Sequence, residues 1–199
     1  MVIIPKGKLM PDISTLGSPI PRPEEIVILP PKILGAATKI GRALKDVQAK
    51  WAFGGDAGEV MLGVNVHPDH LEIVTTKKGT EEICGVLAGY VTLAPAEVEK
   101  KLDREADIEA NMLPVYVKSY YAELSVDEVT VEIYGDEQLK VWEWEWGDPL
   151  DYEAEMINMV GTRVPAVPLK LKSEIDIGLG WLDRVGLISD AVIRSQHRH

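Results

Sequence analysis

Carboxylate and imidazole side chains gather in the short stretch Asp69-His70-Leu71-Glu72, which leads into an apolar run. Residues spaced two apart on a strand point to the same side, so His70 and Glu72 would face one site together. Carboxylate oxygens are the ligands that Mg²⁺ prefers, whereas an imidazole shifts the preference toward softer metals such as manganese or zinc. Asp69 would supply a further oxygen if the loop shifted by one residue. The stretch is therefore a candidate site for a divalent metal.

Two glycines, Gly54 and Gly55, separate a short apolar segment from a segment with helical character. Glycines before a helix let the backbone approach a phosphate closely, and the free amides at the helix start attract negative charge. Asp56 is expected to cap this helix and Glu59 to lie on its surface. A phosphate-binding turn followed by a metal-binding strand would suit a nucleoside triphosphate and its metal ions.

A third carboxylate is offered by Glu132 in the segment "VTVEIYG". Val131 and Ile133 should turn into the core, so Glu132 faces the opposite side of its strand. Two interpretations are open, a site residue or a solvated glutamate on an outer face. Near the C-terminus, Lys172 and Asp183 are further candidates, with a surface lysine and a helix cap as the alternative.

Helices and strands alternate in the pattern expected to position these residues. Helices are predicted over 32–49, 57–64, 80–90 and 94–110, and two more in the tail, divided at 178–180. Strands are predicted over 51–53, 71–75, 115–124, 128–134, 139–146 and 156–164. The order predicts an α+β fold in which helices flank a mixed sheet and the later strands add antiparallel to it.

Three regions follow from this pattern and from the proline content. Residues 1–31 hold seven of the thirteen prolines and are predicted to form an extended arm over the core or over a second subunit. Residues 32–167 form the α/β core, and residues 168–199 form a helical segment packed on it. Trp142, Trp144 and Trp146 share one face of their predicted strand, which favours core packing over stacking with a base or sugar.

Composition excludes several classes of function. A net charge of −11 argues against general nucleic-acid binding, which depends on lysine and arginine contacts with phosphates. The chain has no apolar run long enough to cross a membrane, and its single cysteine, Cys84, is expected to be a buried structural thiol. We therefore expect a cytoplasmic protein. Scarce asparagine and glutamine beside abundant glutamate and lysine are compatible with a thermophilic source.

Gly54-Gly55-x-Ala57, Gly63 and the strand "HLEIVTT" together resemble the nucleotidyltransferase superfamily, most closely its minimal and aminoglycoside-type branches. The resemblance covers roughly residues 33–76 and, more faintly, the tail. It implies a sheet flanked by helices, a bound nucleoside triphosphate, and Mg²⁺ or Mn²⁺ held by an Asp-x-Asp pair and a third carboxylate.

The resemblance assigns roles to individual residues. Glu72, Asp69 and Glu132 would be the catalytic carboxylates, and Glu72, Asp69 and His70 the metal ligands. Nucleotide binding falls to the glycine pair and two tail residues, namely Gly54, Gly55, Lys172 and Asp183. The chain departs from the family where His70 and Glu72 replace the two aspartates, which removes one negative charge from the metal site. The family's transfer reaction is therefore expected to be weakened or lost.

Two other interpretations stay open. His67, His70 and Glu72 would suit zinc, although their spacing matches no closed structural site. Alternatively, the chain is a non-catalytic interaction or oligomerisation protein that uses the proline-rich arm and the tryptophan face, with a homo-oligomer formed through the arm. The two nucleotide hypotheses, an active transferase and a nucleotide-binding protein that has lost the transfer reaction, both depend on Gly55 and Glu72 converging on one pocket.

Overall fold

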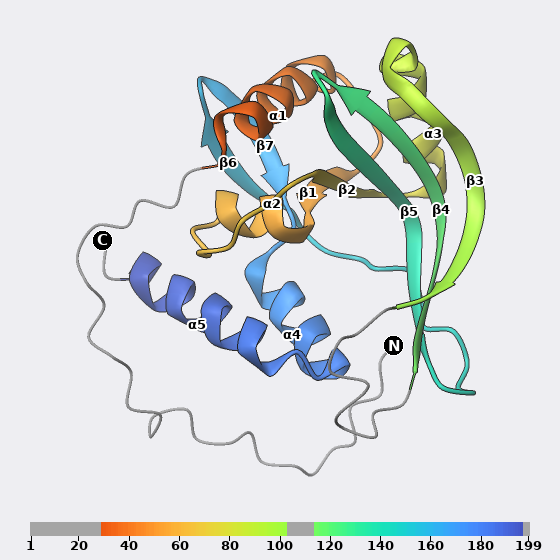
Figure 1. The fold of residues 1–199 in the computed structure, drawn as a ribbon, viewed down its shortest axis with the longest axis vertical. Helices are drawn as coiled ribbons and strands as arrows, with labels where there is room; N and C mark the ends of the chain where they lie inside the picture. The colour runs from red at the N-terminus through yellow and green to blue at the C-terminus, as the bar shows by residue number, and fades with distance from the viewer. Residues whose placement is uncertain (1–28, 103–113, 197–199) are drawn as a thin grey trace.

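A seven-stranded mixed sheet runs through the computed structural model, which describes residues 29–102 and 114–196. The strands lie in the order β3-β4-β5-β2-β1-β7-β6. β5 pairs with β2, and β1 with β7, in parallel, whereas the other neighbours are antiparallel. The α+β class expected from the sequence is confirmed, with a mixed sheet flanked by helices (Figure 1).

The strands of this sheet differ in length, and the longest belong to the β3–β5 meander. They are β1 (Trp51–Gly54), β2 (Leu71–Thr75), β3 (Val91–Lys101), β4 (Val115–Val126), β5 (Val129–Val141), β6 (Glu155–Met159) and β7 (Thr162–Ala166). The helices are α1 (Pro31–Ala43), α2 (Gly55–Met61), α3 (Lys77–Val86), α4 (Leu169–Leu179) and α5 (Leu182–Gln196), with a short 3₁₀ turn at Ala88–Tyr90. Figure 1 places α1 and α3 at the top of the view, α4 and α5 at the bottom, and α2 between them.

The main core lies between the sheet and the helices α1 and α3. One face of α1 is buried through apolar residues at helical spacing, and β1, β2 and β5 contribute Phe53, Ile73 and Ile133, each 0% exposed. Cys84 of α3 is buried beside them, as expected. A smaller cluster, Val64, Leu169, Ile188 and Ala191, packs α4 and α5 against the loop after α2. This second cluster fixes the two C-terminal helices near the end of α2.

Two predicted elements are wrong. The charged segment 94–110, predicted as a helix, forms edge strand β3 up to Lys101, and residues 103–113 lie outside the described part of the chain. β5 ends at Val141, and Trp142 has a left-handed backbone (φ 56°), so the tryptophans lie in a turn rather than on a strand. Trp142 and Trp144 are 47% and 64% exposed, so they do not pack in the core.

The predicted proline-rich arm lies outside the described residues apart from its last three, 29–31. Among the described residues, no helix is both long and apolar enough to cross a bilayer.

Candidate functional site

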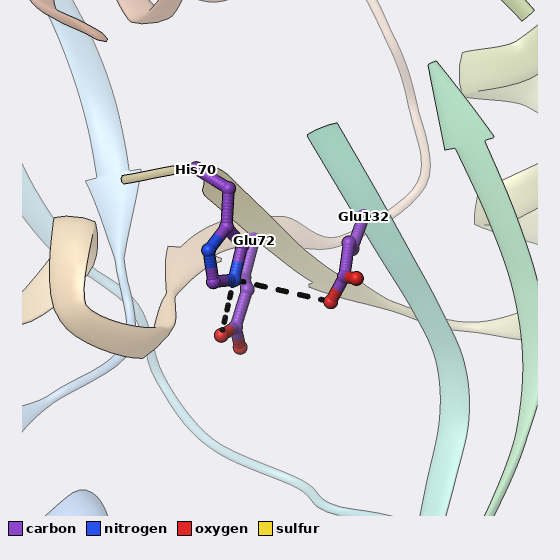
Figure 2. A group of neighbouring side chains, drawn as sticks. All are labelled: His70, Glu72 and Glu132. Atoms are coloured by element: carbon purple, nitrogen blue, oxygen red, sulfur yellow. Dashed lines mark hydrogen bonds and ion pairs between the residues drawn. The ribbon is translucent and has the colours of Figure 1, made fainter. Parts of the chain in front are cut away.

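Three side chains meet where β2 and β5 lie side by side. Glu72 and Glu132 are partners in the parallel register of these strands, and His70 precedes β2 directly (Figure 2). One ligand atom from each lies within 4.8 Å of the other two. His70 Nε2 donates a hydrogen bond to Glu72 Oε1 at 3.1 Å and lies 3.9 Å from Glu132 Oε2. The structure therefore brings together the histidine and both glutamates singled out in the sequence.

His70 is a cation in this cluster. Its pKa is raised from the ordinary 6.5 to about 9, chiefly by the hydrogen bond to Glu72. Partial burial acts in the opposite direction, while the hydrogen bond to Asp69 and the charges of both glutamates raise the pKa further. At neutral pH an imidazolium therefore lies between two carboxylates.

Asp69 does not reach the carboxylate pair. Its side chain is 93% exposed, and its Oδ1 accepts a hydrogen bond from His70 Nδ1 at 2.5 Å. Asp69 thus lies on the far side of the imidazole ring from Glu72 and Glu132. In this arrangement Asp69 orients the ring of His70 and favours its protonated form, and it does not belong to the cluster of possible metal ligands.

The glycine pair lies directly against this cluster. Gly54 is the partner of Glu72 in the antiparallel β1–β2 register, and Gly55 begins α2 with a left-handed backbone (φ 54°). A Cβ atom added to Gly55 would lie 2.4 Å from the Glu72 carboxyl, closer than any side chain allows. Only glycine permits this approach of backbone and carboxylate. The convergence of Gly55 and Glu72 on which both nucleotide hypotheses depend is present.

Gly55 and Glu72 border a cleft of about 680 Å³ between the sheet and the C-terminal helices. Lys172 of α4 and Asp183 of α5 also line it, together with Lys100 of β3. Further lining residues come from α2, β5, the segment before β6, the α4–α5 turn and α5, and include Asp56, Glu59, Tyr134, Glu137, Tyr152, Trp181 and Arg184. The cleft thus combines charges of both signs with aromatic walls.

A network of ion pairs joins α2 to α4 and α5 along this cleft. Lys172 Nζ lies 3.4 Å from Glu59 Oε1 and contacts Asp176, while Arg184 Nε lies 2.9 Å from Glu59 Oε2 and its guanidinium contacts Asp56. Glu59 and Asp176 are 3% and 0% exposed, and burial raises the pKa of both carboxyls although the cations oppose the shift. These five side chains are called the α2–α4–α5 ion cluster below.

This cluster corrects two expectations. Asp56 makes no capping hydrogen bond to α2, whose N-cap is Gly54, because its carboxylate pairs with Arg184 instead. Glu59 was expected on the surface but is buried between two cations. Both partners lie more than a hundred residues away in the chain, so no local pattern reveals them.

Tyr121, Tyr134 and Glu137 are among the site residues that were not singled out from the sequence. Tyr134 and Tyr121 both donate hydrogen bonds to Glu132, Tyr134 to Oε2 and Tyr121 to Oε1 at 3.2 Å. Burial raises the pKa of Glu137, a half-buried residue on the cleft wall, to about 7, and the negative charge of Glu72 adds to the shift. Only Tyr134 carried a local signal, since it lies two residues after Glu132 on one strand.

The donor set fits a divalent cation. Two carboxylates and one imidazole within 4.8 Å of one another provide oxygen and nitrogen ligands in a partly buried setting. The imidazole favours manganese over magnesium, and it binds metal only after losing its proton. Figure 2 shows the carboxyl groups of Glu72 and Glu132 directed toward the Nε2 side of the ring.

No protein-family model matches the chain, and no curated protein matches it in sequence. Among solved structures, a candidate nucleotidyltransferase from Thermotoga maritima superposes with a TM-score of 0.65 at 20% identity, covering 86% of this chain and 97% of its own. The chain has a nucleotidyltransferase-like fold. The family resemblance given by Gly54-Gly55 and "HLEIVTT" is thereby confirmed at the level of fold.

Two further solved structures superpose less well. The lincosamide antibiotic adenylyltransferase LnuA, bound to lincomycin, superposes with a TM-score of 0.47 at 10% identity and covers 82% of this chain and 98% of its own. ANT(2")-Ia in complex with adenylyl-2"-tobramycin superposes with a TM-score of 0.45 at 11% identity and covers 80% of this chain and 88% of its own.

Proposed function

We propose that this nucleotidyltransferase-like protein binds a nucleoside triphosphate together with a divalent metal, and that its transfer activity is weakened or lost. One observation carries the proposal, namely that the Glu72 carboxylate lies against Gly55 and beside Glu132 at the border of the cleft. An arrangement in which backbone glycine and paired carboxylates meet at a cavity is suited to a metal-bound polyphosphate.

Glu72, Glu132 and His70 would hold the metal. A bound divalent cation would neutralise phosphate charge and thereby support attack at phosphorus. Asp69 would act through His70 by fixing the orientation of the ring. Gly54 and Gly55 would let the phosphates approach the backbone closely, because neither carries a side chain; a Cβ on Gly55 would meet the Glu72 carboxyl, and one on Gly54 would meet Val74.

Two features support weak rather than efficient transfer. First, His70 carries a positive charge where a third carboxylate would carry a negative one, so a metal has to displace a proton. Second, Lys172 and Arg184, two cations of the cleft, are engaged by buried acids of the α2–α4–α5 ion cluster. A triphosphate would gain their attraction only by competing with those acids.

Calorimetric titration of the full chain with ATP, GTP, CTP and UTP, each with MgCl₂ or MnCl₂, tests the proposal. We expect metal-dependent binding that Glu72→Gln weakens by about 10-fold or more, because the substitution removes a charged ligand without changing its shape. Glu99→Gln is the matched control, since Glu99 is an exposed glutamate of β3 outside the cluster. Silence with all four nucleotides and both metals would refute the proposal.

Transfer is measured separately from binding with a triphosphate labelled at the α-phosphate. Retained label in the wild-type protein that Glu72→Gln or Glu132→Gln removes would identify residual catalysis at this site. Equal labelling of the wild type and both variants would mean that the chemistry occurs elsewhere. Binding without labelling would identify a binding protein that keeps the fold.

A second candidate function, an interaction or oligomerisation module, is favoured by the exposed indoles of Trp142 and Trp144. Large exposed aromatic side chains are typical of protein contact surfaces. Sedimentation of the wild type, of Trp142→Ser/Trp144→Ser and of a chain lacking residues 1–30 tests it. Fewer subunits per particle in either variant than in the wild type would support the module. A monomer in all three cases would exclude self-association through these parts.

A further inference from the structure

Glu132 is surrounded by hydrogen-bond donors to a degree that Glu72 is not. Tyr134 donates to its Oε2 and Tyr121 to its Oε1 at 3.2 Å, so both carboxylate oxygens accept a tyrosine hydroxyl. The third neighbour is the imidazole of His70, 3.9 Å from Oε2. A glutamate side chain has several rotatable bonds, and these contacts select one of its orientations.

The sheet register explains why the two tyrosines reach one carboxylate. Tyr134 lies two residues after Glu132 on β5 and therefore points to the same face. Tyr121 of β4 is directly opposite Tyr134, and their ring centroids lie 5.3 Å apart. The rings support each other, and both hydroxyls end at Glu132. Such packed aromatic pairs add stability to cross-strand contacts and hold the rings in place.

We infer that Tyr134 and, to a smaller extent, Tyr121 are positioning residues that hold Glu132 in the orientation that completes a divalent-metal site with Glu72 and His70. The inference rests on the proposed function, because it concerns how the proposed metal site is built. Partners that hydrogen-bond to a ligating carboxylate fix its direction, and their loss typically weakens metal binding.

Tyr121 is expected to contribute less than Tyr134. Its hydroxyl is shared between Glu132 at 3.2 Å and Glu123 Oε2 at 3.4 Å, and a phenol has only one proton to donate. Glu123 lies opposite Glu132 in the β4–β5 register, so Tyr121 also relieves repulsion between two like charges. Tyr134 makes its hydrogen bond to Glu132 alone in the described structure.

Mn²⁺ affinity of the full chain, measured by calorimetry or by the paramagnetic resonance signal of free Mn²⁺, tests the inference. We expect Tyr134→Phe to raise the Kd by about 10-fold and Tyr121→Phe by about threefold. Tyr116→Phe is the control, because Tyr116 lies on β4 with its ring beside Lys140 and outside the cluster. A wild-type Kd in all three variants would overturn the inference, as would tighter binding by Tyr134→Phe.

A double-mutant cycle separates positioning from a general structural role. If Tyr134 acts through Glu132, then adding Tyr134→Phe to Glu132→Gln should change the Mn²⁺ Kd less than about twofold. If Tyr134→Phe weakened Mn²⁺ binding about as much in the Glu132→Gln variant as in the wild type, the inference would be overturned, because the tyrosine would then act by another route. A wild-type protein that binds no Mn²⁺ would instead refute the proposed metal site itself, and the positioning role with it.

Discussion

Proton and metal compete for one atom in the proposed site, the Nε2 of His70. This nitrogen donates a hydrogen bond to Glu72 Oε1 at 3.1 Å, and the hydrogen bond raises the pKa of His70 to about 9. A metal ion accepts the nitrogen lone pair only when the imidazole is neutral. We therefore predict that Mn²⁺ binding strengthens as pH rises through the neutral range.

The size of the effect follows from that pKa. At pH 7 a group with a pKa of about 9 is deprotonated in about one molecule in 100, so the apparent affinity is about 100-fold below that of the neutral imidazole. About a third of the side chain, 34%, is exposed, and solvent screening reduces the expected factor to between about 10 and about 100. Below pH 9 each pH unit should change the Kd by up to about 10-fold.

The assay is Mn²⁺ titration from about pH 6.5 to about pH 8.5, a range below the pKa of about 9. His70→Asn removes the titrating group, so its Kd should vary little over this range. His67→Asn is the matched control, because His67 is an exposed histidine three residues away and should keep the wild-type slope. A flat wild-type profile, or the wild-type slope in His70→Asn, would refute the competition.

Three further predictions concern the stability of the fold. Lys172→Met should lower the free energy of unfolding in urea by about 3 kcal/mol or more, because the almost fully buried carboxylates of Glu59 and Asp176 lose this cation. The control Lys170→Met, on the exposed side of α4, should change the free energy of unfolding by less than about 0.5 kcal/mol. Gly55→Ala should destabilise more than Gly63→Ala in thermal unfolding, since both have positive φ but only Gly55 meets a carboxylate 2.4 Å from the added Cβ; equal losses would contradict the close approach. The pKa of His70 is raised on folding, so the contribution of its charge to stability is complete below pH 6.5 and disappears as pH rises through about 9. The free energy of unfolding of the wild type, measured in urea, should therefore fall over this interval, and that of His70→Asn should fall less.

Local sequence signals were sufficient for the part of the fold that carries the site. The alternation of apolar segments and glycines predicts the strand–helix–strand unit of β1, α2 and β2 within a few residues of its observed bounds. Val131 and Ile133 are both 0% exposed, as their alternation with Glu132 predicts. These elements were predictable because burial on one face sets their pattern.

Edge position and backbone conformation explain the failures. β3 lies at the edge of the sheet, where charged side chains are tolerated on a strand, so its Glu- and Lys-rich sequence resembled an exposed helix. Pairing with β4 along its length determines the strand instead. At Trp142 the left-handed backbone turns the chain out of β5, a local event that the alternation of tryptophan and glutamate does not encode.

Charge pairing over long sequence distances was the part of the site that the sequence could not predict. Asp56 and Glu59 looked like a cap and a surface residue because their partners, Lys172 and Arg184, belong to helices at the other end of the chain. A buried carboxylate without a cation would be costly, so the burial of Glu59 depends on the docking of α4 and α5.

The same principle applies at the carboxylate pair and at the α2–α4–α5 ion cluster, and it bears on how a ligand would bind. Glu72 and Glu132 have the imidazolium of His70 beside them, and Glu59 has Lys172 and Arg184, so each group of acids has a resident cation in the described structure. Under the proposed function, a metal would have to replace a proton, and a phosphate would have to compete with a carboxylate. Each exchange would subtract from the affinity for the ligand, whereas the resident ion pairs stabilise the folded protein in the absence of ligand. Under the proposed function, such a site would suit conditional binding, controlled by pH and metal supply, better than rapid turnover.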